Sequence, residues 1–87
     1  MQSIELAYRN LAAAIIIQAV NDYRNALDGV SYNHKPPEAI IKDVESFFHS
    51  SYYKKLTNID GEYILQKLRK EHLERSRNES NPDTGNT

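Results

Sequence analysis

The acidic and histidine side chains near position 45 are the first place where residue types and spacing could do chemistry. Glu45 and His49 lie four residues apart, so on a helix they share one face and could hold a divalent metal if further ligands converged. No further ligand is evident, because His34 falls in an expected loop and His72 on an apolar helix stripe. We therefore predict that the chain has no metal site.

A second polar group, Thr57, Asp60 and Glu62, could serve acid–base chemistry but equally well begin a helix. Capping needs oxygen-bearing side chains at such positions whether or not catalysis takes place, and we interpret Thr57 and Asp60 as a capping box. The sequence has no glycine-rich phosphate loop, serine nucleophile motif or HExxH stretch. Its 87 residues leave little room for a pocket that excludes water. We predict no enzymatic activity, no catalytic residue and no cofactor.

The segment 67–77 holds five basic and two acidic residues, and together with Lys54 and Lys55 it is the only concentration of positive charge. A short helix, a tight turn and a longer helix over residues 51–77 could imitate a helix-turn-helix. However, the acids stand four residues from basic residues, as on an ordinary solvated helix. The net charge of −1 also disfavours non-specific nucleic-acid binding. A small dimeric DNA-binding regulator is therefore kept as the alternative function.

Six tyrosines are many for a chain of this size. Several of them, Tyr32 included, lie near turns or away from the main apolar stripes, where an amphipathic ring suits either the edge of a core or a partner surface. Both interpretations stay open at this point. If a partner surface exists, we expect these tyrosines and the neighbouring lysines to form it: Tyr52, Tyr53, Lys54, Lys55, Tyr63, Lys67 and Lys70.

The composition indicates a small folded domain. Apolar residues make up 39% and charged residues 26% of the chain, whereas a disordered chain would have few aliphatic residues and a large net charge. The absence of cysteine excludes disulfides and thiolate sites and fits a reducing compartment. No apolar stretch approaches the roughly 20 residues that span a membrane, and residues 1–10 lack the basic start of a secretory signal. We expect a cytoplasmic protein without membrane contact.

The first periodic segment predicts a long helix from Ser3, a possible N-cap, to Asp28, with Gly29 as its stop. Its apolar residues surround most of the helix, so it should be covered on more than one side, either as the centre of a bundle or in a homodimer through this helix. The main apolar face and its extension comprise Tyr8, Leu11, Ala12, Ala13, Ile15, Ile16, Ile17, Ala19, Val20, Tyr23 and Leu27.

Two further helices follow, with a short turn over residues 52–56 between them. Pro36 and Pro37 open an amphipathic helix whose apolar face comprises Ile40, Ile41, Val44, Phe47 and Phe48, with Lys42, Glu45 and His49 facing water. The last helix is expected from Asn58 to Arg77, with an apolar stripe of Gly61, Ile64, Leu65, Leu68 and His72. Gly61 on this stripe indicates either a close helix crossing or a tolerated first-turn glycine.

These elements predict an all-α fold, a three-to-four-helix bundle with a long first helix. Residues 1–77 form its single domain. The last ten residues, 78–87, contain no large apolar side chain that could offset the entropy of ordering them. We expect them to form a disordered tail.

Two segments, Ala12 to Leu27 and Phe47 to Glu71, resemble small proteins carried by prophages and conjugative elements of Firmicutes. The resemblance covers about half of the chain. It includes Phe47-Phe48, Ser50, Tyr52-Tyr53, Leu56-Thr57, Ile59 and Asp60-Gly61-Glu62. Members of that group often have an acidic residue and a tryptophan where this chain has Ser51 and Tyr52. The resemblance implies a mobile-element setting and no known catalysis.

The leading functional prediction is a non-enzymatic phage or mobile-element protein that binds another protein in the bacterial cytoplasm. The resemblance makes an inhibitor of a host defence complex, of the anti-CRISPR type, or a modulator of host machinery the natural examples. The DNA-binding regulator is the alternative.

Overall fold

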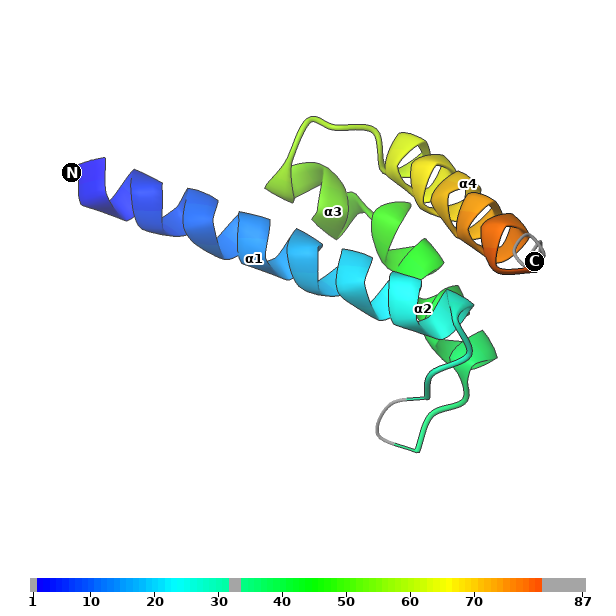
Figure 1. Ribbon diagram of the computed structural model, residues 1–87. Coiled ribbons are helices and arrows are strands. Elements are labelled where there is room, and N and C mark those ends of the chain that lie inside the picture. The colour runs from blue at the N-terminus through cyan, green and yellow to red at the C-terminus, as the bar shows by residue number, and fades with distance from the viewer. Residues whose placement is uncertain (1, 32–33, 81–87) are drawn as a thin grey trace.

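The computed structural model describes residues 2–31 and 34–80 of the chain. Within them the chain forms four helices and no strand: α1 (Gln2–Leu27), α2 (Pro37–Phe48), α3 (Ser51–Leu56) and α4 (Gly61–Ser80) (Figure 1). The predicted all-α fold with a long first helix is confirmed. Tyr32 and most of the predicted tail, residues 81–87, lie outside the described residues.

Gly29 ends α1 as the sequence predicts. It adopts φ +88°, a left-handed conformation that glycine takes without steric cost. Its N–H donates to the carbonyl of Ala26 (2.9 Å) and the N–H of Val30 donates to that of Asn25 (2.9 Å), the hydrogen-bond pattern of a Schellman motif. At the other end the helix already includes Gln2, so Ser3 lies inside the first turn, and its predicted role as N-cap is wrong.

A proline and a serine set the limits of α2 and α3. Pro36 occupies the N-cap of α2 with Pro37 directly after it, where the missing N–H costs no helical hydrogen bond. Ser50 separates α2 from α3, because its Oγ donates to the carbonyl of Phe47 (2.7 Å) and accepts from the N–H of Tyr53 (3.1 Å). Ser50 is thereby the N-cap of α3.

The last helix begins and ends later than predicted. It starts at Gly61 rather than Asn58, because Asp60 is the residue that caps it by accepting from the N–H of Glu62 (3.1 Å). Thr57 instead accepts from the N–H of Ile59 (3.2 Å), a local turn, so the predicted capping box is wrong. The helix continues to Ser80, three residues beyond its predicted end at Arg77.

The core lies where α1, α2, α3 and α4 meet, around Tyr23, Phe48, Tyr53 and Leu65, whose exposed fractions are at most 2%. Phe47, Phe48 and Tyr53 pack with ring centroids 5.1–5.6 Å apart, the tilted arrangement that aromatic pairs prefer. The predicted apolar face of α2 and the predicted stripe of α4 are confirmed as the sides that pack inward.

Gly61 marks the closest approach between α2 and the start of α4. A Cβ at this position would lie 2.1 Å from the carbonyl oxygen of Phe48. Of the two interpretations of this glycine, the close approach of two backbones is the one that the structure shows.

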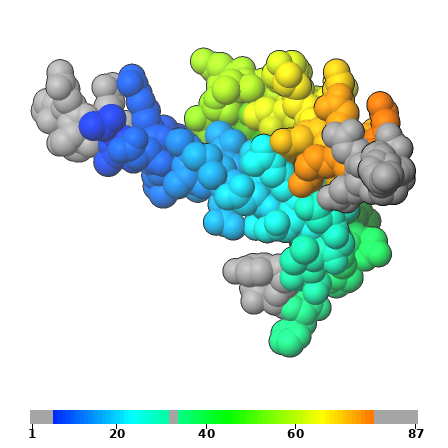
Figure 2. All heavy atoms as spheres, viewed as in Figure 1, coloured from blue at the N-terminus to red at the C-terminus, as the bar shows by residue number. Residues whose placement is uncertain are grey.

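The N-terminal part of α1 extends past the other three helices, and no other described element lies beside its first turns (Figures 1 and 2). The radius of gyration is 16.2 Å, against about 12 Å for a compact domain of this length. Ile17, Ala13 and Leu11 are exposed. α1 contacts α2, α3 and α4, yet residues 2–31 and 34–80 leave this part of its surface uncovered, so the expected cover of Ile17 within the single chain is not found.

Candidate functional site

The N-terminal part of α1 is unusually apolar for an exposed surface. Leu6, Tyr8, Leu11 and Ile17, called the α1 surface below, each leave 53–59% of their area exposed. Isolated exposed apolar residues are ordinary, but several along one helix mark a site of association. Between Leu6 and Asn21 the helix has a single charged residue, Arg9. The surface can therefore bind apolar groups but has almost no electrostatic pattern of its own.

A shallow groove runs between α1 and the segment that joins α3 to α4. Ile17 on α1 and Ile59 on the joining segment are both more than half exposed along it. The hydroxyl of Tyr8 donates to the carbonyl of Lys55 (3.3 Å) and ties the two sides together at one end. The lining residues are Tyr8, Arg9, Ala12, Ala13, Ile16, Ile17, Leu56, Thr57 and Ile59. Such a lining accepts an apolar side chain or helix rather than a reacting substrate.

The structure divides the predicted tyrosine and lysine surface. Tyr53 is 1% exposed and belongs to the core, so its predicted part in binding a partner is wrong. Tyr63, Lys67 and Lys70 share the outer face of α4, and Lys67 Nζ lies 5.7 Å from the centroid of the Tyr63 ring. This distance allows a cation–π interaction.

The other predicted contact residues lie on α3. Tyr52 is exposed, although its ring centroid is 6.1 Å from that of Phe47. Lys54 and Lys55 stand in the last turn of the helix, where positive charge interacts favourably with the helix dipole. Their positive charge is therefore favourable for α3 itself, and their predicted contact with a partner stays a prediction.

Acidic residues neutralise part of the basic segment of α4. Arg69 pairs with Glu45 (3.1 Å) and Glu62 (3.3 Å), and Arg75 pairs with Asp28 (3.3 Å). The suitability of this segment for DNA rests on five basic residues. Two of the five, Arg69 and Arg75, instead form ion pairs within the protein. This weakens the charge pattern on which the helix-turn-helix alternative depends.

A polar cluster joins α1, α2 and α4 at the edge of the core. The Tyr23 hydroxyl donates to Glu45 Oε2 (2.7 Å) and accepts from Arg69 Nε (3.0 Å), and His49 Nε2 is 2.7 Å from Glu62 Oε1. Sequence reasoning missed this cluster and placed Glu45 in water. The i, i+4 pattern of α2 could not reveal that a long side chain at the edge of its polar face reaches a buried tyrosine.

These contacts shift the ionisation of the cluster. Burial, followed by the hydrogen bond to Glu45, raises the pKa of Tyr23 above its ordinary value. The Tyr23 hydroxyl, aided by Arg69, lowers the pKa of Glu45, and the contact with His49 is the main cause that lowers the pKa of Glu62. The hydrogen bond to Tyr23 raises the pKa of Arg69. At neutral pH these shifts keep Glu45 and Glu62 ionised, Arg69 positively charged and Tyr23 neutral. The contacts between α1, α2 and α4 are therefore present at neutral pH.

Glu45 and His49 do not come together as a pair of metal ligands. Glu45 faces Tyr23 and Arg69, while His49 faces Glu62. Among residues 2–31 and 34–80, no three or more acidic, histidine or cysteine side chains are grouped so that they could hold a metal ion.

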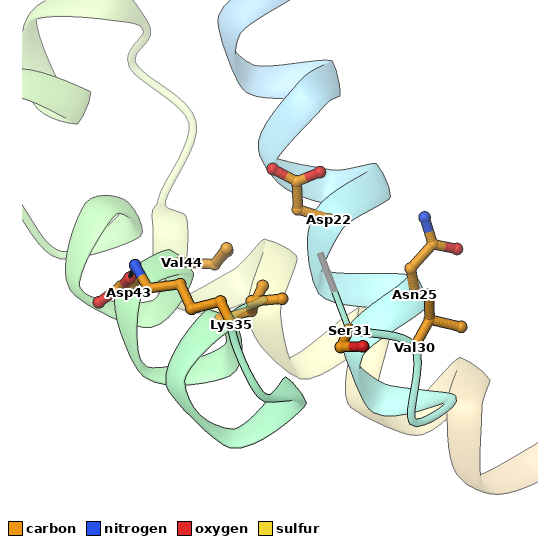
Figure 3. A pocket seen from close by; sticks show the side chains of 8 residues that line it. Asp22, Asn25, Val30, Ser31, Lys35, Asp43 and Val44 are labelled. Atoms are coloured by element: carbon orange, nitrogen blue, oxygen red, sulfur yellow. Dashed lines mark hydrogen bonds and ion pairs between the residues drawn. The ribbon is translucent and has the colours of Figure 1, made fainter. Parts of the chain in front are cut away.

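A small cleft lies between the end of α1 and α2 (Figure 3). Asp22 and Asn25 come from α1, and Lys35 forms an ion pair with Asp43 at the opposite wall. The cleft is open and polar on that wall. We assign it no function.

No protein-family model, curated protein or solved structure gives a significant match to this chain. No helix within the described ranges is long and apolar enough to cross a membrane.

Proposed function

We propose that this is a non-enzymatic protein that works by binding another protein through the α1 surface. The observation that carries the proposal is the exposure of Leu6, Tyr8, Leu11 and Ile17 on a helix whose apolar residues extend around most of its circumference. A helix of that kind is normally buried, and the other helices of the chain cover only part of it. A partner that covers the rest would remove apolar side chains from water, the main driving force of protein association.

The groove beside the α1 surface supports the same proposal. It offers side chains of Ile17, Ile59 and Leu56, with Arg9 as the charged residue at its edge. An apolar groove next to an exposed helix is the arrangement in which amphipathic partner helices dock. A partner surface with apolar side chains at helical spacing and an acidic residue opposite Arg9 fits this chemistry.

For the biological setting we propose a bacterial mobile element and action in the cytoplasm of its host. The support is the resemblance of Ala12 to Leu27 and Phe47 to Glu71 to proteins of prophages and conjugative elements. In that setting an inhibitor of a host defence complex, of the anti-CRISPR type, or a modulator of host machinery fits a small protein with one adhesive helix. Such a protein acts by occupying a surface and needs no catalytic residues.

Cross-linking in bacterial cells tests the proposal. Tagged wild-type protein, the variant Leu11→Glu and the control Leu73→Glu are expressed in the host, cross-linked, purified under denaturing conditions and analysed by mass spectrometry. Leu73 is also exposed but lies on α4, away from the α1 surface, so the control introduces the same charge elsewhere. We expect one defined host or phage protein to be cross-linked by wild type and Leu73→Glu and lost from Leu11→Glu.

A set of cross-linked proteins that Leu11→Glu leaves unchanged would refute the proposal. Titration of the protein with duplex DNA at several salt concentrations then tests the DNA-binding alternative. A regulator would show an affinity that falls steeply with salt, because it releases counterions from the phosphates. A protein-binding molecule would show no measurable DNA affinity at physiological salt.

A further inference from the structure

We infer that a second copy of this chain packs against the Ile17 side of α1, so that two α1 helices pair in antiparallel orientation. The inference rests on the proposed function, because it names the occupant of one side of the α1 surface. Ile17 and Leu11 lie about 120° apart around the helix. The dimer therefore leaves the Leu11 side of each copy available to another protein.

The residues on the Ile17 side have the spacing of a coiled-coil seam. Leu6, Asn10, Ala13, Ile17 and Val20 follow one another in steps of four and three residues, the repeat that brings every side chain of a row to one partner helix. The first four are exposed and Val20 is partly buried. Such a row recognises a straight helix with the same repeat, and α1 of a second copy is a helix of that kind.

Ala13 stands at the centre of this row and has alanine on both sides in the sequence. Small side chains at a crossing point let two helix axes come close together. With a two-fold axis at Ala13, Leu6 of each copy meets Val20 of the other, and Asn10 of each copy lies near Ile17 of the other. The row therefore meets the same row of a second copy, as the interface of a two-fold dimer must.

The shape of the chain favours the antiparallel orientation. The other helices pack mainly along the C-terminal half of α1, and its first turns extend past them (Figures 1 and 2). Antiparallel pairing places the two bundles at opposite ends, whereas parallel pairing would bring them to the same end. It also separates the two Arg9 side chains by about 12 Å along the helices, while a parallel pair would set these like charges at one level.

The exposed apolar area of the row is small. Leu6 and Ile17 are each 58% exposed, which corresponds to roughly 100 Å² of apolar surface per side chain. With Asn10 and Ala13 beside them, the row is an interface well below the roughly 800 Å² per partner of a standard one, as in weak and transient complexes. We therefore expect a dimer that forms at micromolar concentrations and dissociates on dilution.

Sedimentation equilibrium over a range of concentrations tests the inference. The wild type, 10.0 kDa as a monomer, should approach twice that mass as its concentration rises. Ile17→Glu should raise the dissociation constant by at least roughly 100-fold, because the dimer would bury two unpaired carboxylates. Leu73→Glu adds the same charge outside the row and should dimerise like wild type. Circular dichroism should show equal helix content in all three proteins, since Ile17 is 58% exposed in the single chain.

Cysteine cross-linking tests the orientation without relying on Ile17→Glu. The natural chain has no cysteine, so a mixture of Leu6→Cys and Val20→Cys proteins should form the mixed disulfide faster than either forms a disulfide with itself. Ala13→Cys should cross-link to its own copy. Preferred Leu6→Cys self-cross-linking would refute the antiparallel arrangement.

Two further results would overturn the inference: a wild type that stays monomeric at every concentration, or a dimer that Ile17→Glu leaves intact. Neither result affects the proposed function, which is tested with Leu11→Glu and a different partner. Conversely, a dimer without any cross-linked host or phage protein would support the inference and refute the wider proposal. Each hypothesis can therefore be refuted without refuting the other.

Discussion

At the scale of single residues, the structure leaves no room for a side chain at Gly61. An added Cβ would lie 2.1 Å from the carbonyl oxygen of Phe48, and the obstacle is backbone, which cannot rotate away as a side chain could. We predict that Gly61→Ala lowers the free energy of unfolding by about 3 kcal/mol, measured by urea denaturation. The added methyl group would push the start of α4 away from the end of α2.

Gly29 provides the matched control at the end of another helix. No atom lies within 4 Å of its added Cβ, but its φ of +88° strains any other residue. Gly29→Ala should therefore cost only about 1 kcal/mol. Equal effects of the two substitutions would mean that backbone conformation, and not the contact with Phe48, is what requires glycine at position 61.

Glu45 gives the stability of the protein a defined dependence on acid. Its pKa is lowered in the folded state by the Tyr23 hydroxyl and Arg69, so it contributes stability above its ordinary pKa of 4.5 and loses it as the pH falls through the lowered value. We predict that Glu45→Gln lowers the melting temperature at neutral pH and that the difference from wild type shrinks below pH 4.5. Thermal denaturation at several pH values measures both.

Glu62→Gln is a comparison within the same cluster, because the pKa of Glu62 is also lowered, mainly by His49. The stability of Glu62→Gln should therefore fall less than that of wild type as the pH is lowered through the same range. If Glu45→Gln and wild type lost stability in parallel down to low pH, the Tyr23, Glu45 and Arg69 contacts would not contribute to folding.

At the scale of elements, the two phenylalanines at the end of α2 have different roles. From the sequence they appear equivalent, yet Phe48 is 2% exposed whereas Phe47 lies at the edge of the core. We predict that Phe48→Ala lowers the free energy of unfolding by about 4 kcal/mol, and Phe47→Ala by roughly 2 kcal/mol. Equal losses in chemical denaturation would show that Phe47 is buried to the same extent.

The apolar periodicity of the sequence was enough to predict three helices and which faces of α2 and α4 pack inward. It placed the start of α4 at Asn58 because Thr57 and Asp60 have the spacing of a capping box. The structure shows that Asp60 alone caps the helix. Helix limits depend on which of several oxygen-bearing side chains accepts the first amide, and the pattern of apolar residues does not contain that information.

The candidate site was predictable only in part. The sequence indicated that α1 needs neighbours on several sides, but it could not show which part of α1 lacks them. That depends on geometry, because α1 has 26 residues while α2 has 12 and cannot cover its whole length. A place near a turn and away from the main apolar stripes predicts Tyr53 at a partner surface, whereas the turn at Ser50 directs it into the core.

At the scale of the whole molecule, one end of the chain is well packed and the other leaves apolar side chains exposed. The packed end, where the helices meet, buries Tyr23, Phe48, Tyr53 and Leu65, and the polar cluster joins the helices at its edge. The other end presents Leu6, Leu11 and Ile17 to water. Because small domains have little stability in reserve, covering this surface should stabilise α1 as well as bind the partner.

Hydrogen exchange along α1 can detect that coupling directly. Residues 6–13 lack tertiary contacts over much of their surface, so in the monomer their amides should open locally and exchange fast, whereas residues 19–27 pack against the core and should be protected. Dimerisation would bury the Ile17 row and slow exchange in residues 6–13 as the concentration rises, with little change in 19–27. In Ile17→Glu the first segment should exchange fast at every concentration. Protection that is uniform along α1 and independent of concentration would show that the helix is stable without a partner, and the exposed residues would then have no part in holding it together.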